Sequence, residues 1–173
     1  SWDYDVEMPG FKYNMTDVQA AVGMHQLRKL DGFHARRREV VELYRAALGD
    51  DPGFELPSEL PHASSAWHLF VLRLRPERLG MERDRFIEEL KARNIGTSVH
   101  YRPLHMMTFY ARKYGYRPEQ FPVALDAFQR MVSLPLNPRL TDQDVDDVVT
   151  AVREATAVRP PSLVPSGSVA AAS

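Results

Sequence analysis

Polar side chains in the stretch GFKYNMTDVQAAVG, residues 10–23, lie where they could bind an anion. Lys12 offers an amine and Asn14 an amide on a turn after Gly10, just before a helix that we expect to begin at Thr16. Backbone N–H groups at a helix N-terminus attract anions such as phosphate, and neighbouring donors add to that attraction. Lys12 and Asn14 are equally typical of an ordinary turn that binds no ligand. The spacing of these residues does not distinguish the two interpretations.

A second group of polar residues follows the end of a predicted strand at 97–101. His100 and His105 bracket the letters YRPL, which contain Tyr101 and Arg102. Side chains just past a strand end often contact ligands, although surface loops have a similar composition. The sequence has no cysteine and no H-E-x-x-H pattern, so we predict no metal site. No nucleophile elbow supports Ser-His-Asp chemistry.

A long predicted helix over residues 16–48 holds the first group. Thr16 can cap this helix through its hydroxyl while Gln19 reaches back to the cap, which is the capping-box pattern. A helix of this length spans about 45 Å, so we expect it to connect two bodies. Its apolar positions recur at three- and four-residue steps and predict one buried face: Leu27, Leu30, His34, Val41, Tyr44 and Leu48.

The rest of the chain alternates between predicted strands and helices. The apolar run WHLFVLRL, residues 67–74, is typical of a buried strand and places His68 in the core. Thr141 should cap a last helix whose valines share one face. Between them we expect a helix at 81–93, a strand at 97–101, a helix at 123–132 and an extended segment at 133–138. This order predicts an α/β fold, with a small sheet and helices packed on one face.

Composition excludes several classes of function. The formal net charge is −1, so the sequence lacks the net positive charge that would attract nucleic acid. No apolar run in the sequence is long enough to cross a membrane. The absence of cysteine and of a visible signal peptide fits a cytoplasmic protein. We expect a disordered tail at 158–173. The chain begins at Ser1 and not at a methionine, which we interpret as a cut through a longer protein.

Several segments, in order, resemble one protein family. The stretch GFKYNMTDVQAAVGMHQLRKLD is followed by AWHLFVLRL, LKARNIGTSVHYRPLH, YARKYGY and FPVALDAFQRMVSLPLNPRLTDQDVDDVV. Together they are similar to the DegT/DnrJ/StrS family of pyridoxal-phosphate-dependent sugar aminotransferases over roughly residues 4–155. The letters G-F-K-Y-N, with GTSVHYR later, most resemble the branch that makes UDP-4-amino-4-deoxy-L-arabinose.

The resemblance implies a division of the chain and a set of contacts. It implies that the chain is the C-terminal portion of a fold-type I enzyme and contains its small domain. Residues 1–15 would end the large domain, residues 16–48 would form an interdomain helix, and residues 49–157 would form the small α/β domain. Asn14, and with it Lys12, would contact the phosphate of pyridoxal 5'-phosphate in the neighbouring subunit of a homodimer. The loop at 100–105 would line the nucleotide-sugar pocket, which makes Tyr101, Arg102 and His105 substrate-binding candidates.

The resemblance also implies that part of the enzyme lies outside this chain. The family holds its cofactor through a lysine in the large domain, and none of the four lysines here has that sequence context: Lys12, Lys29, Lys91 and Lys113. We therefore assign no catalytic residue to this chain and expect it to be the C-terminal part of an aminotransferase. The full-length enzyme would transfer an amino group from glutamate to a keto-sugar nucleotide. The product would be used to make cell-surface or secondary-metabolite sugars. Two alternatives stay open, a non-catalytic binding module of the same fold and an interaction domain that pairs through the long helix.

Overall fold

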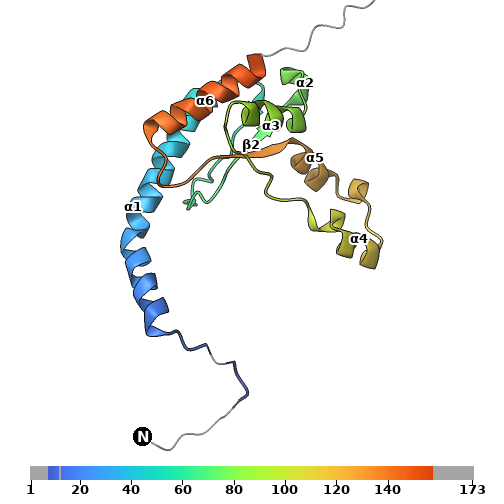
Figure 1. The fold of residues 1–173 in the computed structure, drawn as a ribbon. Helices are drawn as coiled ribbons and strands as arrows, with labels where there is room; N and C mark the ends of the chain where they lie inside the picture. Colours follow the sequence, from blue (N-terminus) through green and yellow to red (C-terminus); the bar gives the residue numbers. More distant parts are fainter. Residues whose placement is uncertain (1–7, 12, 158–173) are drawn as a thin grey trace, which may run out of the picture.

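A computed structural model describes residues 8–11 and 13–157 (Figure 1). The predicted tail at 158–173 lies outside the described residues. Two 3-10 turns, Leu104–Met106 and Pro118–Gln120, flank the helix α4. In chain order the other elements are α1 Asp17–Leu48, β1 Phe54–Glu55, β2 Phe70–Leu74, α2 Pro76–Leu79, α3 Arg83–Ala92, α4 Thr108–Tyr114, α5 Pro122–Arg130, β3 Met131–Leu134 and α6 Asp142–Ala157.

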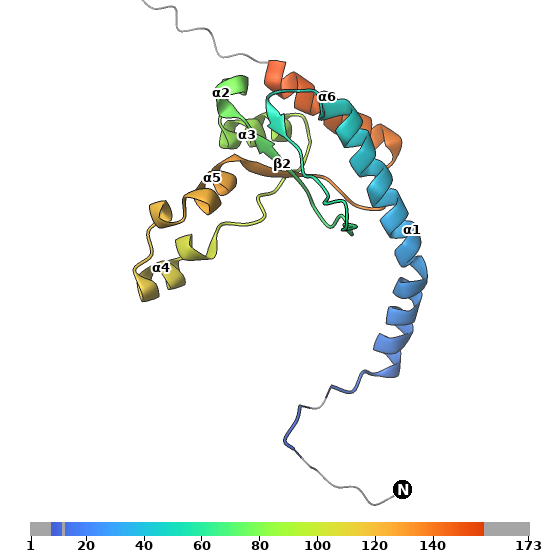
Figure 2. The same cartoon turned by 180° about the vertical axis from the view of Figure 1, so that it is seen from behind.

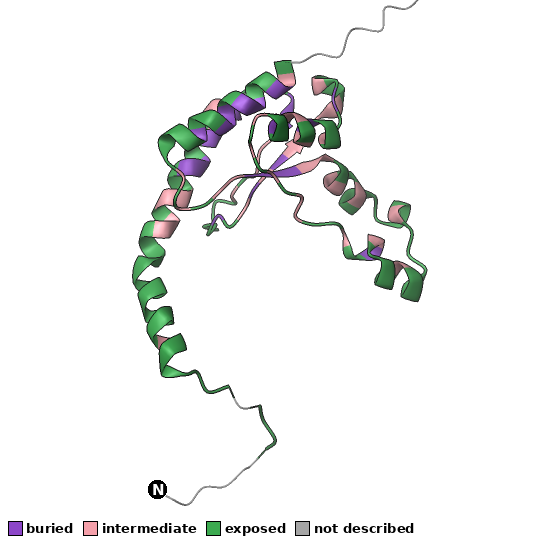
Figure 3. Cartoon of the chain, in the orientation of Figure 1, coloured by how far each residue is buried: buried purple, intermediate pink, exposed green. Residues whose placement is uncertain are grey.

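The first helix begins where the sequence predicts and is packed only along its second half. The Thr16 backbone N–H donates to Gln19 Oε1 at 3.0 Å, and the Gln19 N–H donates to Thr16 Oγ1 at 3.3 Å, which completes the capping box. Buried residues begin only at Val40. Leu27 is 70% exposed, so within the described residues the predicted apolar face is packed only toward the C-terminal end of α1 (Figure 3).

The three strands form one antiparallel sheet in the order β1-β2-β3. Alternate residues of β2 are buried, as expected for a strand with one covered face. Phe70 pairs with Leu134 and Leu72 pairs with Val132, so the two strands present their apolar side chains to the same face.

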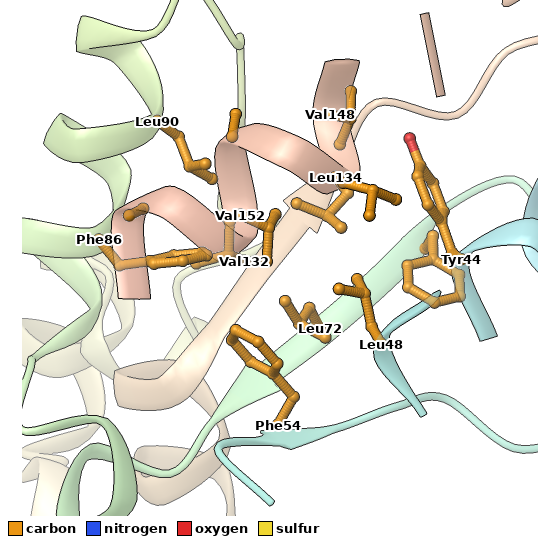
Figure 4. Close-up of a cluster of buried hydrophobic side chains, with 14 of the residues drawn as sticks. Tyr44, Leu48, Phe54, Leu72, Phe86, Leu90, Val132, Leu134, Val148 and Val152 are labelled. Atoms are coloured by element: carbon orange, nitrogen blue, oxygen red, sulfur yellow. The ribbon is translucent and has the colours of Figure 1, made fainter. Parts of the chain in front are cut away.

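The core lies between this sheet face and three helices. Figure 4 shows side chains from α1, α3 and α6 meeting those of the strands. The rings of Tyr44 and Phe70 lie 5.0 Å apart, and the Tyr44 hydroxyl donates to the Pro135 carbonyl at 2.8 Å. Helix α6 starts after Thr141, whose backbone N–H donates to Asp144 Oδ2 at 2.7 Å. The valines predicted for its inner face are all buried: Val145, Val148, Val149 and Val152.

Two local predictions are wrong. The segment 97–101 is not a strand, because only Ser98 pairs with β3, through a single bridge to Ser133. His68 is exposed and not in the core. The strand starts later than expected, at Phe70, because Trp67 adopts a left-handed conformation with φ of 47° and turns the chain there.

Residues 101–121, which we call the α4 segment, extend away from the sheet and helices (Figures 1 and 3). The segment contains one short helix, α4, and the two 3-10 turns. The α4 helix ends at Gly115, whose φ of 67° is the left-handed conformation that glycine adopts without steric cost. This turn folds the chain back, so that the Tyr116 ring stacks beside the Tyr114 ring with their centroids 5.4 Å apart.

Candidate functional site

The first candidate group lies just outside the capped N-terminus of α1. Asn14 precedes the cap by two residues and is exposed. The cap is formed by Thr16 and Gln19, so the Asn14 amide is not needed to start the helix. Lys12, the other predicted phosphate ligand, lies outside the described residues. The arrangement leaves an exposed amide at a helix end that favours anions, which is the chemistry of a phosphate contact.

The second candidate group is anchored to the sheet by Ser133. This serine lies on β3 and is buried. Its backbone exchanges two hydrogen bonds with Ser98, and its Oγ lies 2.9 Å from Nδ1 of His100. Three hydrogen bonds therefore fix the chain immediately before Tyr101 and Arg102. Sequence analysis did not single out Ser133, although a lone hydroxyl within the apolar letters MVSLPL is a signal for a buried polar contact.

Tyr101 and Arg102 extend from this anchor into solvent. The Tyr101 ring lies edge-on to the His100 ring, 4.8 Å between centroids, and Tyr101 is 68% exposed. Arg102 is exposed and forms no ion pair or hydrogen bond with any other residue that the structure describes. Its guanidinium can therefore present two N–H donors to the oxygens of a phosphate or carboxylate.

His105, the third predicted substrate contact, has different surroundings. It is 8% exposed, and its ring stacks on Phe121 with centroids 4.4 Å apart. It lines a hollow of about 700 Å³ in the α4 segment, which we call the aromatic hollow. We define this hollow by Leu104, His105, Tyr110, Tyr114, Tyr116 and Phe121.

The structure does not bring Asn14 together with the loop at 100–105. The turn before α1 lies at the far end of the long helix, and the α4 segment projects on the other side of the sheet (Figures 1 and 2). The two groups can contribute to one site only if another chain, or another part of a longer protein, lies between them.

Two further features are absent from residues 8–11 and 13–157. They contain no group of three His, Asp or Glu side chains placed to hold a metal ion. Within the same residues, no helix combines the length and the apolar character that crossing a membrane requires.

Fold and sequence together define the class of this protein. The long helix, the three-stranded antiparallel sheet and the surrounding helices match the C-terminal part of fold-type I aminotransferases. DesV from S. venezuelae shares 33% identity with a TM-score of 0.77, over 88% of this chain and 40% of DesV. The putative sugar aminotransferase Spr1654 from Streptococcus pneumoniae, in its PLP form, shares 27% identity with a TM-score of 0.78, over 93% of this chain and 41% of Spr1654.

Sequence comparison defines the family. Residues 2–153 match the DegT/DnrJ/EryC1/StrS aminotransferase family, and the chain belongs to it. The spore coat polysaccharide biosynthesis protein SpsC of Bacillus subtilis is 44% identical over 155 residues, which are 89% of this chain and 40% of SpsC. The chain thus spans about 40% of the length of the curated relatives that it matches.

Proposed function

We propose that this chain is the C-terminal portion of a pyridoxal-phosphate-dependent aminotransferase that moves an amino group from glutamate to a keto-sugar nucleotide. The product would enter the synthesis of a cell-surface or secondary-metabolite sugar, and the sequence resemblance favours the branch that makes UDP-4-amino-4-deoxy-L-arabinose. One observation carries the proposal. A chain of this family, spanning about 40% of its relatives, presents the exposed Asn14 amide beside a capped helix N-terminus.

The described residues fit the phosphate end of the cofactor. Asn14 offers an N–H donor that neither the capping box nor packing uses, and the N-terminus of α1 favours a dianion beside it. Lys12 would add a positive charge. When bound, pyridoxal phosphate carries the amino group and withdraws electrons from the carbon that bears it.

None of the lysines that the structure describes has the surroundings expected of the lysine that binds the cofactor covalently. Lys29 is exposed on α1, and Lys91 is exposed and lies 3.9 Å from Glu88. The Lys113 Nζ lies 5.4 Å from the centroids of both the Phe109 and Tyr114 rings. An enclosed amine with a lowered pKa is needed to form and exchange a covalent bond with a carbonyl. We infer that this lysine belongs to an N-terminal domain outside the chain.

The nucleotide sugar would lie along the loop at 100–105. Arg102 presents a free guanidinium fork that suits a phosphate, and Tyr101 offers an exposed ring and hydroxyl beside it. Ser133 would hold both by fixing the preceding residues. His105 would contact the substrate from the aromatic hollow.

A homodimer would explain why the two groups lie apart within one chain. Asn14 would reach across the interface to the cofactor of the partner subunit, while the loop at 100–105 would serve the site of its own subunit. We propose that this assembly acts in the cytoplasm.

Sequencing the coding region upstream of Ser1, followed by an assay of the full-length protein, tests this function. We expect an in-frame N-terminal domain that contains the cofactor lysine, and glutamate-dependent amination of a keto-sugar nucleotide by the full-length protein. The 173-residue chain alone should show no turnover. Turnover by the chain alone would contradict the assignment. A full-length protein that binds the nucleotide sugar but never consumes glutamate would instead support a non-catalytic binding module.

A further inference from the structure

The three consecutive arginines of α1 have different surroundings. Arg36 forms an ion pair with Asp142 at 2.8 Å. Arg38 donates to the hydroxyl of Ser64 at 2.8 Å. Arg37 forms no ion pair and no hydrogen bond with any residue that the structure describes, and its Nε atom is buried. Its guanidinium is therefore a half-buried charge without an acidic partner among the described residues.

Arg37 lies on the face of α1 that packs against the core. It precedes Tyr44 by about two helical turns, and residues at that spacing share one side of a helix. Tyr44 is fully buried. Phe33 and Leu30 continue the same side, about one and two turns before Arg37. Phe33 is half-buried and Leu30 is 38% exposed. The guanidinium thus lies in a row of apolar side chains, where the core of this chain ends.

A charged group in this position needs an acceptor. A guanidinium keeps its charge in proteins and offers only N–H donors. Burying such a donor without an acceptor costs free energy, and a carboxylate recovers that cost through two parallel charge-assisted hydrogen bonds. A free phosphate would also accept these bonds, but it would leave Leu30 and Phe33 uncovered. A protein surface that carries an acidic side chain among apolar ones matches both the charge and its neighbours.

The N-terminal domain inferred above is the surface that the observations favour. The N-terminal half of α1 extends away from the sheet and the other helices (Figures 1 and 2), and most of it is exposed (Figure 3). The chain spans about 40% of its curated relatives, so most of a protein of that length would lie outside it. We propose that Arg37 forms an ion pair with a carboxylate of the N-terminal domain, and that apolar side chains of that domain cover Leu30 and Phe33. This inference rests on the proposed function, in which that domain is inferred.

Hydrogen exchange at two chain lengths tests whether the partner lies outside this chain. In the full-length protein, Arg37→Met removes the guanidinium and leaves the acid unpaired, so the backbone amides near position 37 should exchange about ten- to hundred-fold faster. In the 173-residue chain the same variant loses no partner and should exchange no faster than the parent. Faster exchange by the same factor at both lengths would place the partner within the chain and overturn the proposal. Unchanged exchange in the full-length variant would overturn it as well.

Arg38→Met is the matched control, because it makes the same change at the next position of the helix. It breaks the hydrogen bond to Ser64, and both of these residues belong to this chain. Its effect on hydrogen exchange should therefore be the same in the 173-residue chain and in the full-length protein. If Arg38→Met instead reproduced the full-length effect of Arg37→Met, the comparison would report a general loss of charge, and the proposal would be overturned.

Cross-linking identifies the acid directly. In the full-length protein, Arg37→Lys keeps a positive charge and supplies an amine, which a water-soluble carbodiimide joins to a carboxylate in contact with it. Mass spectrometry of the digest should find this amine joined to an aspartate or glutamate upstream of Ser1. Arg38→Lys, at the position beside Ser64, should not yield that product. No product from Arg37→Lys, or a product joined only to residues 1–173, would overturn the proposal.

Mixing isotopically labelled and unlabelled protein separates the remaining occupants of this surface. A cross-link between a labelled and an unlabelled copy, joined to an acid within residues 1–173, would assign the Arg37 surface to a second copy of this chain and overturn the proposal. These readouts do not depend on turnover. A full-length protein that gives the upstream cross-link but never consumes glutamate would refute only the proposed aminotransferase function. An active aminotransferase without the cross-link would refute only the ion pair.

Discussion

The Nδ1 atom of His100 lies 2.9 Å from the Oγ of Ser133, and this contact joins the loop at 100–105 to the last strand of the sheet. β3 has β2 on one side only, so its other edge is free to pair with a passing segment. Ser98 pairs with that edge through two backbone hydrogen bonds to Ser133. The side chain of Ser133 then forms a hydrogen bond with His100, two residues further along the chain. One buried hydroxyl thus connects the rigid sheet to a loop that presents Tyr101 and Arg102.

Removing the Ser133 hydroxyl should loosen this loop. In Ser133→Ala we expect a loss of about 1 kcal/mol in the free energy of unfolding, typical of one hydrogen bond, measured by urea denaturation. In the full-length protein the KM for the nucleotide sugar should rise while the cofactor affinity stays unchanged. Ser98→Ala is the control, because Ser98 pairs through its backbone and its side chain is exposed. Equal losses in the two variants would contradict a specific role for the Ser133 hydroxyl.

The buried Tyr44 phenol makes stability depend on pH in a defined direction. Burial raises the pKa of this phenol, because the charged form is poorly solvated inside the core. The folded chain therefore keeps the proton at pH values where the unfolded chain has lost it. The stabilising contribution of Tyr44 is complete below about pH 10 and is lost as the pH rises through the raised folded-state pKa.

Tyr44→Phe tests this behaviour. At pH 7 the variant should lose about 1 kcal/mol, because the Pro135 carbonyl no longer receives its hydrogen bond. The difference in unfolding free energy between the parent chain and the variant should shrink as the pH is raised from about 8 to 11, which urea denaturation at several pH values measures. The exposed Tyr101 provides the control at pH 7, since its hydroxyl forms no hydrogen bond within the described residues and Tyr101→Phe should leave the unfolding free energy unchanged there. A constant difference between the parent chain and Tyr44→Phe would refute the account.

The sequence predicted the elements that local chemistry defines. Capping residues at Thr16 and Thr141 marked the starts of α1 and α6, and valine spacing identified the inner face of α6. The prediction for α1 failed at Leu27 and Leu30, because periodicity identifies an apolar face but does not tell which part of it has a partner in the same chain.

The errors elsewhere came from tertiary structure. The residues at 97–101 have strand-like composition, yet only Ser98 pairs with the sheet. The left-handed conformation of Trp67, which turns His68 out of the core, is not indicated by the types of the neighbouring residues. Asn14, Tyr101 and Arg102, which the sequence suggested as ligand contacts, are exposed in the structure, and their roles stay predictions. The different surroundings of His105 depend on rings up to sixteen positions away, and no local pattern reports them.

Arg102 should serve substrate binding and not cofactor binding. In the full-length protein, Arg102→Ala should raise the KM for the nucleotide sugar about ten- to hundred-fold, the effect of losing a hydrogen bond to a charged group. Arg102→Lys should recover only part of the loss, because an ammonium group cannot form the two parallel bonds of a guanidinium. Arg139→Ala, at an exposed position in the loop before α6, is the control for general charge effects. A loss of cofactor affinity with unchanged sugar kinetics would contradict the assignment.

Asn14 should act on the cofactor, and Thr16 should act on the helix. In the full-length protein, Asn14→Ala should raise the dissociation constant for pyridoxal phosphate about ten- to hundred-fold, because a hydrogen bond to a charged group is lost. The helix should remain, since its cap uses Thr16 and Gln19. Thr16→Ala should instead fray the first turn of α1, seen as faster hydrogen exchange of the amides after Thr16. An unchanged dissociation constant in Asn14→Ala would remove this residue from the site.

If the full-length protein forms the proposed homodimer, mixed dimers test which subunit's cofactor site Asn14 serves. One subunit carries Asn14→Ala with the cofactor lysine intact, and the other lacks the lysine but keeps Asn14. If Asn14 reaches across the interface, the site with the intact lysine also receives the intact Asn14, so each mixed dimer has one complete site and about half of the parental activity. If Asn14 serves its own subunit, the lysine and Asn14 belong to different sites and neither is complete. Tagging the two subunits differently isolates the mixed dimer, and a cofactor titration then distinguishes a site of parental affinity from a weakened one.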